Sequence, residues 1–141
     1  TMLENHFTKF IVWYRWVDKS GFAQFKDQAF TSVPSLVKKF IAPVVARKIG
    51  KGLYNEGTGR LSEAEILQLA KKDLDAVSNY LGGREYFFGE QPSMIDAVIF
   101  ATIGNVILSN IEIPLRELAY KYDNLVSHSN RMMQRYFADI Q

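Results

Sequence analysis

The spacing of apolar positions along the chain predicts helices and no strands. From Met2 to Asp18, apolar side chains recur every three or four positions, which is the period of one face of an α-helix. A second long repeat of this kind begins after Ser62 and stops at Gly82-Gly83, where glycine accepts the backbone conformation that often ends a helix. Alternation of apolar and polar residues and hairpin turn signals are both missing between these segments. The pattern therefore predicts an all-α domain.

Further segments complete a predicted bundle of about five to six helices around a central buried helix. The apolar run that follows Ser93 predicts this central helix, because it is apolar on nearly every side. Residues 35–49 predict another helix, kinked at Pro43. Residues 21–33 predict a loop, and residues 50–59 predict a flexible glycine-rich connector. The side chains expected to face inward on the helix over residues 35–49 are Leu36, Phe40, Ile41, Val44, Val45 and Ile49.

The first helix has more apolar surface than a helix at the edge of a bundle needs. A single apolar stripe is enough to bury one side of a helix. This segment has two neighbouring stripes, so we expect it to pack on two sides, against its own bundle and against a partner surface. The alternative is a well-buried helix with no functional role. The two stripes consist of Leu3, Phe7, Phe10, Tyr14 and Val17, and of His6, Trp13 and Trp16.

The start of the central helix carries the residues of a capping box. Ser93 stands at the N-cap position and Asp96 at the third helical position, where their side chains can satisfy exposed backbone amides. The charge of Asp96 also suits the positive end of the helix dipole. Ser62 and Glu65 form a similar box at the start of the preceding long helix. A buried carboxylate could instead be catalytic, but the cap geometry already accounts for Asp96.

Composition narrows the classes of function. The 141 residues have a net charge of +2 with no basic run, so we expect no nucleic-acid partner. Cysteine is absent, which excludes thiolate metal sites and a cysteine nucleophile in this stretch. His6 and His128 lack the spacing of metal ligands, so we expect no metal site. The longest apolar run, residues 97–103, is far shorter than the roughly 20 residues of a membrane span. We expect a cytoplasmic location.

Residues 86–97 form the most specific motif of the chain. An aromatic pair and a glycine precede Pro92-Ser93, and Asp96-Ala97 then leads into the apolar helix. This order resembles the N-capping box of glutathione-transferase C-terminal domains. The whole chain is similar, more narrowly, to the branch that includes bacterial glutathione-transferase-like proteins, the failed-axon-connections proteins and the metaxins. The supporting segments are residues 3–6, 13–16, 70–78, 114–115, 124–126, 131–132 and 135–137.

The resemblance implies a thioredoxin-like domain before this one, which in such proteins binds glutathione and supplies the catalytic Tyr, Ser or Cys. Because Met2 stands second, we expect residues 1–141 to be one domain cut from a longer protein. This domain would hold no cofactor, and glutathione would bind only to the full-length protein. The resemblance also implies that the first helices form part of the acceptor-substrate pocket. We therefore place Phe10, Trp13, Tyr14 and Arg15 at or near that cleft or the inter-domain face.

Two functions follow from the resemblance. In the first, the chain is the helical domain of a glutathione transferase, forms the acceptor-substrate side of the cleft and is catalytically silent on its own. In the second, it is a non-catalytic interaction module in which the aromatic face of the first helix meets a protein. The residues leave open whether the full-length protein is an enzyme. They also leave open whether it forms the homodimer that is common in the superfamily.

Overall fold

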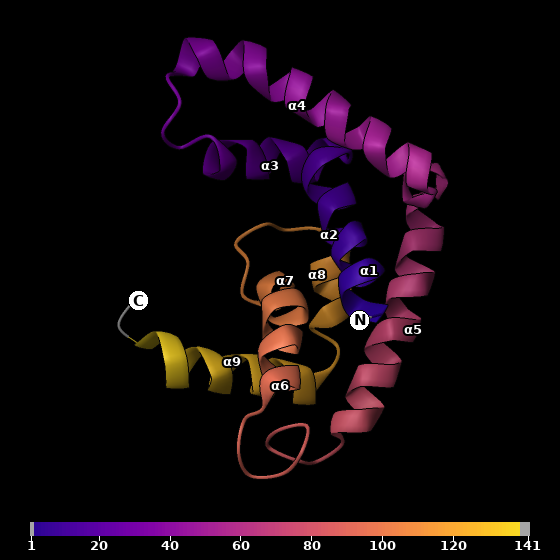
Figure 1. The fold of residues 1–141 in the computed structure, drawn as a ribbon, viewed down its shortest axis with the longest axis vertical. Helices are drawn as coiled ribbons and strands as arrows, with labels where there is room; N and C mark the ends of the chain where they lie inside the picture. The colour runs from indigo at the N-terminus through magenta and orange to yellow at the C-terminus, as the bar shows by residue number, and fades with distance from the viewer. Residues whose placement is uncertain (1, 139–141) are drawn as a thin grey trace.

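The computed structural model describes residues 2–138, and over that range the chain is helical and contains no strand. The predicted all-α class is therefore confirmed (Figure 1). The longer helices are α2 (Phe7–Trp16), α3 (Lys19–Ala29), α4 (Ser35–Glu56), α5 (Glu63–Leu81) and α9 (Asp123–Phe137). The shorter ones are α1 (Met2–Asn5), α6 (Met94–Ile99), α7 (Asn105–Ile107) and α8 (Pro114–Ala119), with a 3₁₀ turn η1 (Thr58–Arg60) and a π-helical turn η2 (Phe100–Gly104).

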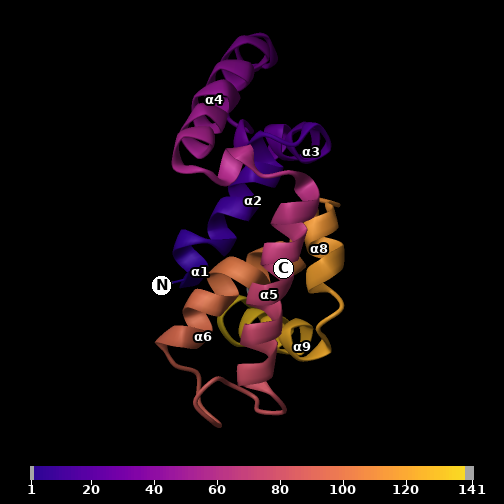
Figure 2. The ribbon, with the colours of Figure 1, turned by 90° about the vertical axis from the view of Figure 1, so that its right-hand side faces the viewer.

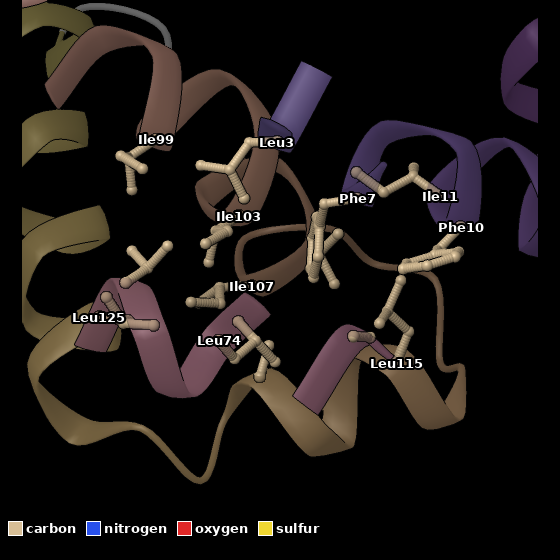
Figure 3. Close-up of a cluster of buried hydrophobic side chains, with 14 of the residues drawn as sticks. Leu3, Phe7, Phe10, Ile11, Leu74, Ile99, Ile103, Ile107, Leu115 and Leu125 are labelled. Carbon is tan, nitrogen blue, oxygen red and sulfur yellow. The ribbon is translucent and has the colours of Figure 1, made fainter. Parts of the chain in front are cut away.

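The core surrounds a helical column made of α6, η2 and α7, which follow one another without a break from residue 94 to residue 107. Ile103 and Ile107 of this column are fully buried. Figure 3 shows Phe7 of α2, Leu74 of α5 and Leu115 of α8 around them. Burying one such side chain contributes about 1.5–3 kcal/mol. The column is thus the central helix that the sequence predicts.

One side of the column is left uncovered by the described residues. Met94 is 84% exposed, and Ala97, Ala101 and Asn105 are exposed along the same side. The apolar sequence suggested that the central helix is enclosed on every side, and the structure corrects this expectation. Met94, Ala97, Ala101 and Asn105 form the uncovered row of the column. Ala97 and Ala101 have little apolar surface to bury, so the chain folds without covering them.

Residues 19–29 form helix α3, which corrects the loop predicted there. The carboxylate of Asp18 caps the helix by accepting a hydrogen bond from the backbone N–H of Gly21 at 2.7 Å. A Cβ atom added to Gly21 would lie 2.0 Å from the carbonyl oxygen of Tyr14. The glycine that suggested a loop is instead required for the close approach of α3 to α2. The ring of Trp16 lies against the rings of Phe22, Phe25 and Phe30.

Helix α4 is longer than the sequence predicted. It passes through Pro43 without a break and continues through Gly50 and Gly52 to Glu56. The expected glycine-rich connector is thus mostly helix. The helix ends at Gly57, whose φ of 112° is a conformation that glycine adopts without strain.

The orientation of α4 also differs from the prediction. Figures 1 and 2 show α3 and α4 extending away from the other helices, and α4 packs mainly on α2 and η1. Ala42 and Leu53 are the buried residues of this helix. Four of the side chains expected to face inward are exposed instead, namely Leu36, Phe40, Ile41 and Val44. Within the described residues, no helix combines the length and the apolar character that crossing a bilayer requires.

Candidate functional site

The carboxylate of Asp96 is fully buried and joins three parts of the chain. Its Oδ2 atom accepts hydrogen bonds from the backbone N–H of Ser93 at 2.8 Å and from the Ser93 hydroxyl at 2.7 Å. Its Oδ1 atom accepts from the backbone N–H of Phe87 at 3.0 Å and from Nε2 of His128 at 2.9 Å. The start of α6, the loop before it and helix α9 are therefore held together by one buried charge.

The charge states in this network follow from burial and hydrogen bonding. Burial raises the pKa of the Asp96 carboxyl, but the hydrogen bonds from Phe87, Ser93 and His128 outweigh it and hold the pKa below its ordinary value. Burial lowers the pKa of His128 despite the nearby Asp96, and Arg131 lowers it further. The pair is accordingly a carboxylate and a neutral imidazole at neutral pH.

The neutral imidazole of His128 carries its proton on Nε2, because the carboxylate of Asp96 can only accept. Its Nδ1 atom is buried and has no hydrogen-bond partner among the described residues. Neither His128 nor Asp96 lines the cavities described below, so the pair supports the fold rather than chemistry. The sequence prediction missed this histidine. His128 lies three positions after Leu125 and four before Met132, on the buried side of α9. This helical spacing was the signal that could have predicted its burial.

The second histidine joins α5 to the start of the chain. Nδ1 of His6 lies 2.7 Å from Oδ2 of Asp73, which is buried. Among the residues that the structure describes, no group of three or more His, Cys, Asp or Glu side chains could hold a metal ion. The His6–Asp73 contact therefore acts as a tether between helices.

The four residues predicted near a cleft lie in different environments. Phe10 and Tyr14 are 1% and 0% exposed and belong to the core. The Tyr14 hydroxyl donates to Glu63 at 3.2 Å, and burial together with this carboxylate raises the pKa of Tyr14. Trp13 is half-buried, with its ring edge-on to Tyr14. Arg15 lines a cavity. A cleft role for these residues stays a prediction, and Arg15 is the one that the geometry supports.

The cavity beside Arg15 has a volume of about 600 Å³ and lies between α2, α3, the central column and α9. We call it the Arg15 cleft. A second cavity of about 720 Å³ adjoins it, since Phe100 and Ala101 line both. Besides Arg15, the side chains that decide the chemistry of the cleft are the carboxamides of Gln28, Asn105 and Asn110 and the apolar groups of Phe100, Leu108 and Met133.

The guanidinium of Arg15 is half-buried and makes no ion pair with any described residue. Its Nη2 atom donates to Oδ1 of Asn105 at 2.5 Å, and its Cζ atom lies 5.2 Å from the centre of the Phe25 ring. Burial lowers the pKa of Arg15, but an arginine stays charged at neutral pH. The sequence prediction missed Asn105, although its polar side chain interrupts an apolar helix.

Comparisons with known proteins agree with the resemblance. Residues 70–132 match the family described as glutathione S-transferase, C-terminal domain. Failed axon connections of Drosophila melanogaster is 30% identical over 98% of this chain, and Metaxin-3 of Danio rerio is 27% identical over 88%. An isoprene-epoxide–glutathione S-transferase of Rhodococcus sp. (strain AD45) is 24% identical over 96%. The chain spans 36%, 42% and 58% of the lengths of these relatives. No solved structure matches.

The matched residues contain much of the core, while α2 contributes further core residues from outside the match. The matched residues run from the second turn of α5 through the capping network and the central column to α9. With the relatives that match most of its length, these findings show that the chain is similar to glutathione S-transferase C-terminal-like domains, in the branch that includes failed axon connections and the metaxins.

Proposed function

We propose that in the full-length protein this domain forms the acceptor-substrate side of a ligand cleft, facing a preceding thioredoxin-like domain. The observation that carries the proposal is the position of the Arg15 cleft beside the uncovered row of the central column. Ala101 and Asn105 line the Arg15 cleft and are also exposed on the uncovered side of the column. A row of small exposed side chains next to a cavity leaves space for a ligand and for a second domain that closes over it.

The lengths of the relatives support a second domain. This chain spans 58% of the Rhodococcus protein, whose name describes a glutathione transferase that acts on an isoprene epoxide. By this likeness, the preceding domain of the full-length protein would bind glutathione. The sulfur of glutathione would then form a bond to a carbon of an electrophile held at the Arg15 cleft; with an epoxide, the carbon–oxygen bond opens and the oxygen takes up the proton that the thiol releases.

The helical domain is proposed to be catalytically silent on its own. A protein hydroxyl can stabilise a thiolate only if it is free to donate a hydrogen bond to the sulfur. The hydroxyls of Tyr14 and Tyr122 already donate to the carboxylates of Glu63 and Asp75, at 3.2 and 2.7 Å. Burial and these carboxylates raise the pKa of both tyrosines, which opposes a role in thiol activation.

Retention on immobilised glutathione tests this division of roles. The full-length protein is expected to bind the resin and to elute with free glutathione, whereas the 141-residue chain is expected to pass through. Retention of the 141-residue chain would contradict the proposal. If neither protein is retained, the result would favour the second candidate function.

The second candidate is a non-catalytic interaction module, which the likeness to failed axon connections and the metaxins supports. Its docking surface was expected on the aromatic face of the first helix. Phe7, Phe10 and Tyr14 of its first stripe are at most 1% exposed and are committed to the core, whereas Trp13 and Trp16 of its second stripe are half-buried. Docking through this helix stays a prediction. A homodimer and a cytoplasmic location stay predictions.

A further inference from the structure

We infer that the outer side of α4 binds the surface of a bilayer that contains anionic lipids. We call this side the α4 face. It consists of the exposed apolar side chains Leu36, Val37, Phe40, Ile41 and Val44 and of the exposed cations Lys39, Arg47, Lys48 and Lys51. Binding would take place at the bilayer surface, because none of the described helices has the length and apolar character of a span. The α4 face is separate from the Arg15 cleft, so binding there does not depend on the proposed function.

The apolar part of the α4 face lies in the half of α4 that is nearer to α3 along the chain. Leu36, Phe40 and Val44 follow one another at intervals of about one helical turn and are 79%, 73% and 68% exposed. Single exposed apolar side chains are common on proteins, but five of them on one helix mark a surface that another molecule covers. Figures 1 and 2 show the hairpin of α3 and α4 extending away from the other helices. Within the described residues, this side of α4 is therefore left without a cover.

The charge of the α4 face is entirely positive. Residues 28–55 contain five Lys and Arg side chains and no Asp or Glu. These five cations exceed the net charge of +2 of the whole chain, so the rest of the chain is net negative. Lys38 is paired, since its Nζ atom lies 2.7 Å from Oδ1 of Asp27. The four cations of the α4 face make no ion pair with any described residue, and they are therefore available to an anionic partner.

The order of these side chains along α4 fits an anionic bilayer. The apolar side chains occupy residues 36–44, and three of the cations, Arg47, Lys48 and Lys51, follow them within the next two turns. A tilted helix would place its apolar half at the edge of the hydrocarbon layer and its cations among the lipid phosphates. The long stems of Lys and Arg help, because they carry the charge into the headgroup layer while their methylene groups cover apolar surface.

Two other partners fit the α4 face less well. A second copy of this chain in a two-fold dimer would bring the same cations together, and like charges repel. A protein partner would have to supply a groove that is both acidic and apolar, because α4 projects from the domain. A bilayer supplies hydrocarbon beneath anionic headgroups without such a groove.

Flotation with lipid vesicles tests the inference on the 141-residue chain. One set of vesicles contains phosphatidylcholine alone, and the other contains equal amounts of phosphatidylcholine and phosphatidylglycerol. The chain is expected to bind the anionic vesicles at least about tenfold more tightly than the neutral ones. Arg47→Gln, Lys48→Gln and Lys51→Gln together should weaken this binding by about 100-fold, because each cation near an anionic surface contributes about fivefold.

Two further variants separate the contributions of position and of apolar surface. Lys71→Gln, Lys72→Gln and Lys121→Gln together are the matched control, because they remove the same charge from exposed positions outside the hairpin. This control is expected to bind like the unchanged chain. Leu36→Ser with Phe40→Ser leaves the charge unchanged and should weaken binding to the anionic vesicles by about tenfold or more.

Each other outcome would overturn a part of the inference. Failure to bind either kind of vesicle would overturn it entirely, and equal binding to both would refute the role of charge. An equal loss in the control variant would refute the assignment to α4. Unchanged binding of the Leu36 and Phe40 variant, with circular dichroism showing a folded chain, would refute the apolar contact. None of these changes lies in the Arg15 cleft, so retention on immobilised glutathione tests the proposed function separately.

Discussion

Replacing Asp96 with asparagine tests whether the buried capping network holds the helical bundle together. The carboxylate accepts hydrogen bonds at both of its oxygens from Ser93, Phe87 and His128. The amide of asparagine keeps one oxygen and replaces the other with an NH₂ group, which cannot accept. In either orientation, the backbone N–H of Ser93 or that of Phe87 is left facing this NH₂ group. The variant therefore leaves a buried donor without an acceptor.

The expected loss follows from burial. A hydrogen bond to a charged group contributes about 1.5–3 kcal/mol, and an unsatisfied buried donor costs about 1–3 kcal/mol. Because Asp96→Asn loses charge-assisted hydrogen bonds and leaves a buried donor without an acceptor, the expected total loss is about 3 kcal/mol. For a chain of this length, such a loss lowers Tm by about 10 °C.

Thermal unfolding followed by circular dichroism at the helical band measures the difference. The matched control is Glu65→Gln, because Glu65 accepts the same two hydrogen bonds from Ser62 but is exposed. Its Tm is expected to fall much less. If Asp96→Asn lowers Tm no more than Glu65→Gln does, the buried network does not stabilise the fold as argued.

Three further predictions concern stability. Gly21→Ala should cost about 3 kcal/mol in urea denaturation, because its Cβ atom would lie 2.0 Å from the Tyr14 carbonyl oxygen; an unchanged midpoint would contradict the close approach. Burial lowers the pKa of His128, so the stability that its neutral imidazole contributes is complete above the ordinary pKa of 6.5 and is lost as the pH falls. His128→Gln should therefore flatten the fall in unfolding free energy between about pH 7 and pH 5. Leu74→Ala should cost about 2–5 kcal/mol, whereas Phe40→Ser, at 73% exposure, should change stability by less than about 0.5 kcal/mol; equal losses would place Phe40 in the core.

The starts of the two capped helices could be predicted because their signals act over three residues. Ser62 with Glu65 and Ser93 with Asp96 each bond within one helical turn, so the local backbone alone brings them together. The end of α5 at Gly82 was predictable for the same reason. The period of the apolar residues likewise predicted helices, since that period follows from backbone geometry.

The orientation of α4 could not be predicted in this way. Periodicity shows that a helix has an apolar side, but it does not show whether another element covers that side. Leu36, Phe40 and Val44 lie one helical turn apart, which suggested a buried face, yet they are exposed. Gly21 misled the prediction for a related reason. Its role in the contact between α2 and α3 depends on a neighbour that the local sequence does not specify.

The sequence by itself determined the helical class and the capping boxes, whereas the cleft role of Arg15 stays a prediction. The tertiary structure alone decided which side chains meet across the bundle. Asp96 and His128 are 32 positions apart, and Arg15 and Asn105 are 90 apart. A local pattern reports only on residues within about one or two turns of a helix. Contacts over such separations arise from the packing of whole helices, and so do the buried network and the Arg15 cleft.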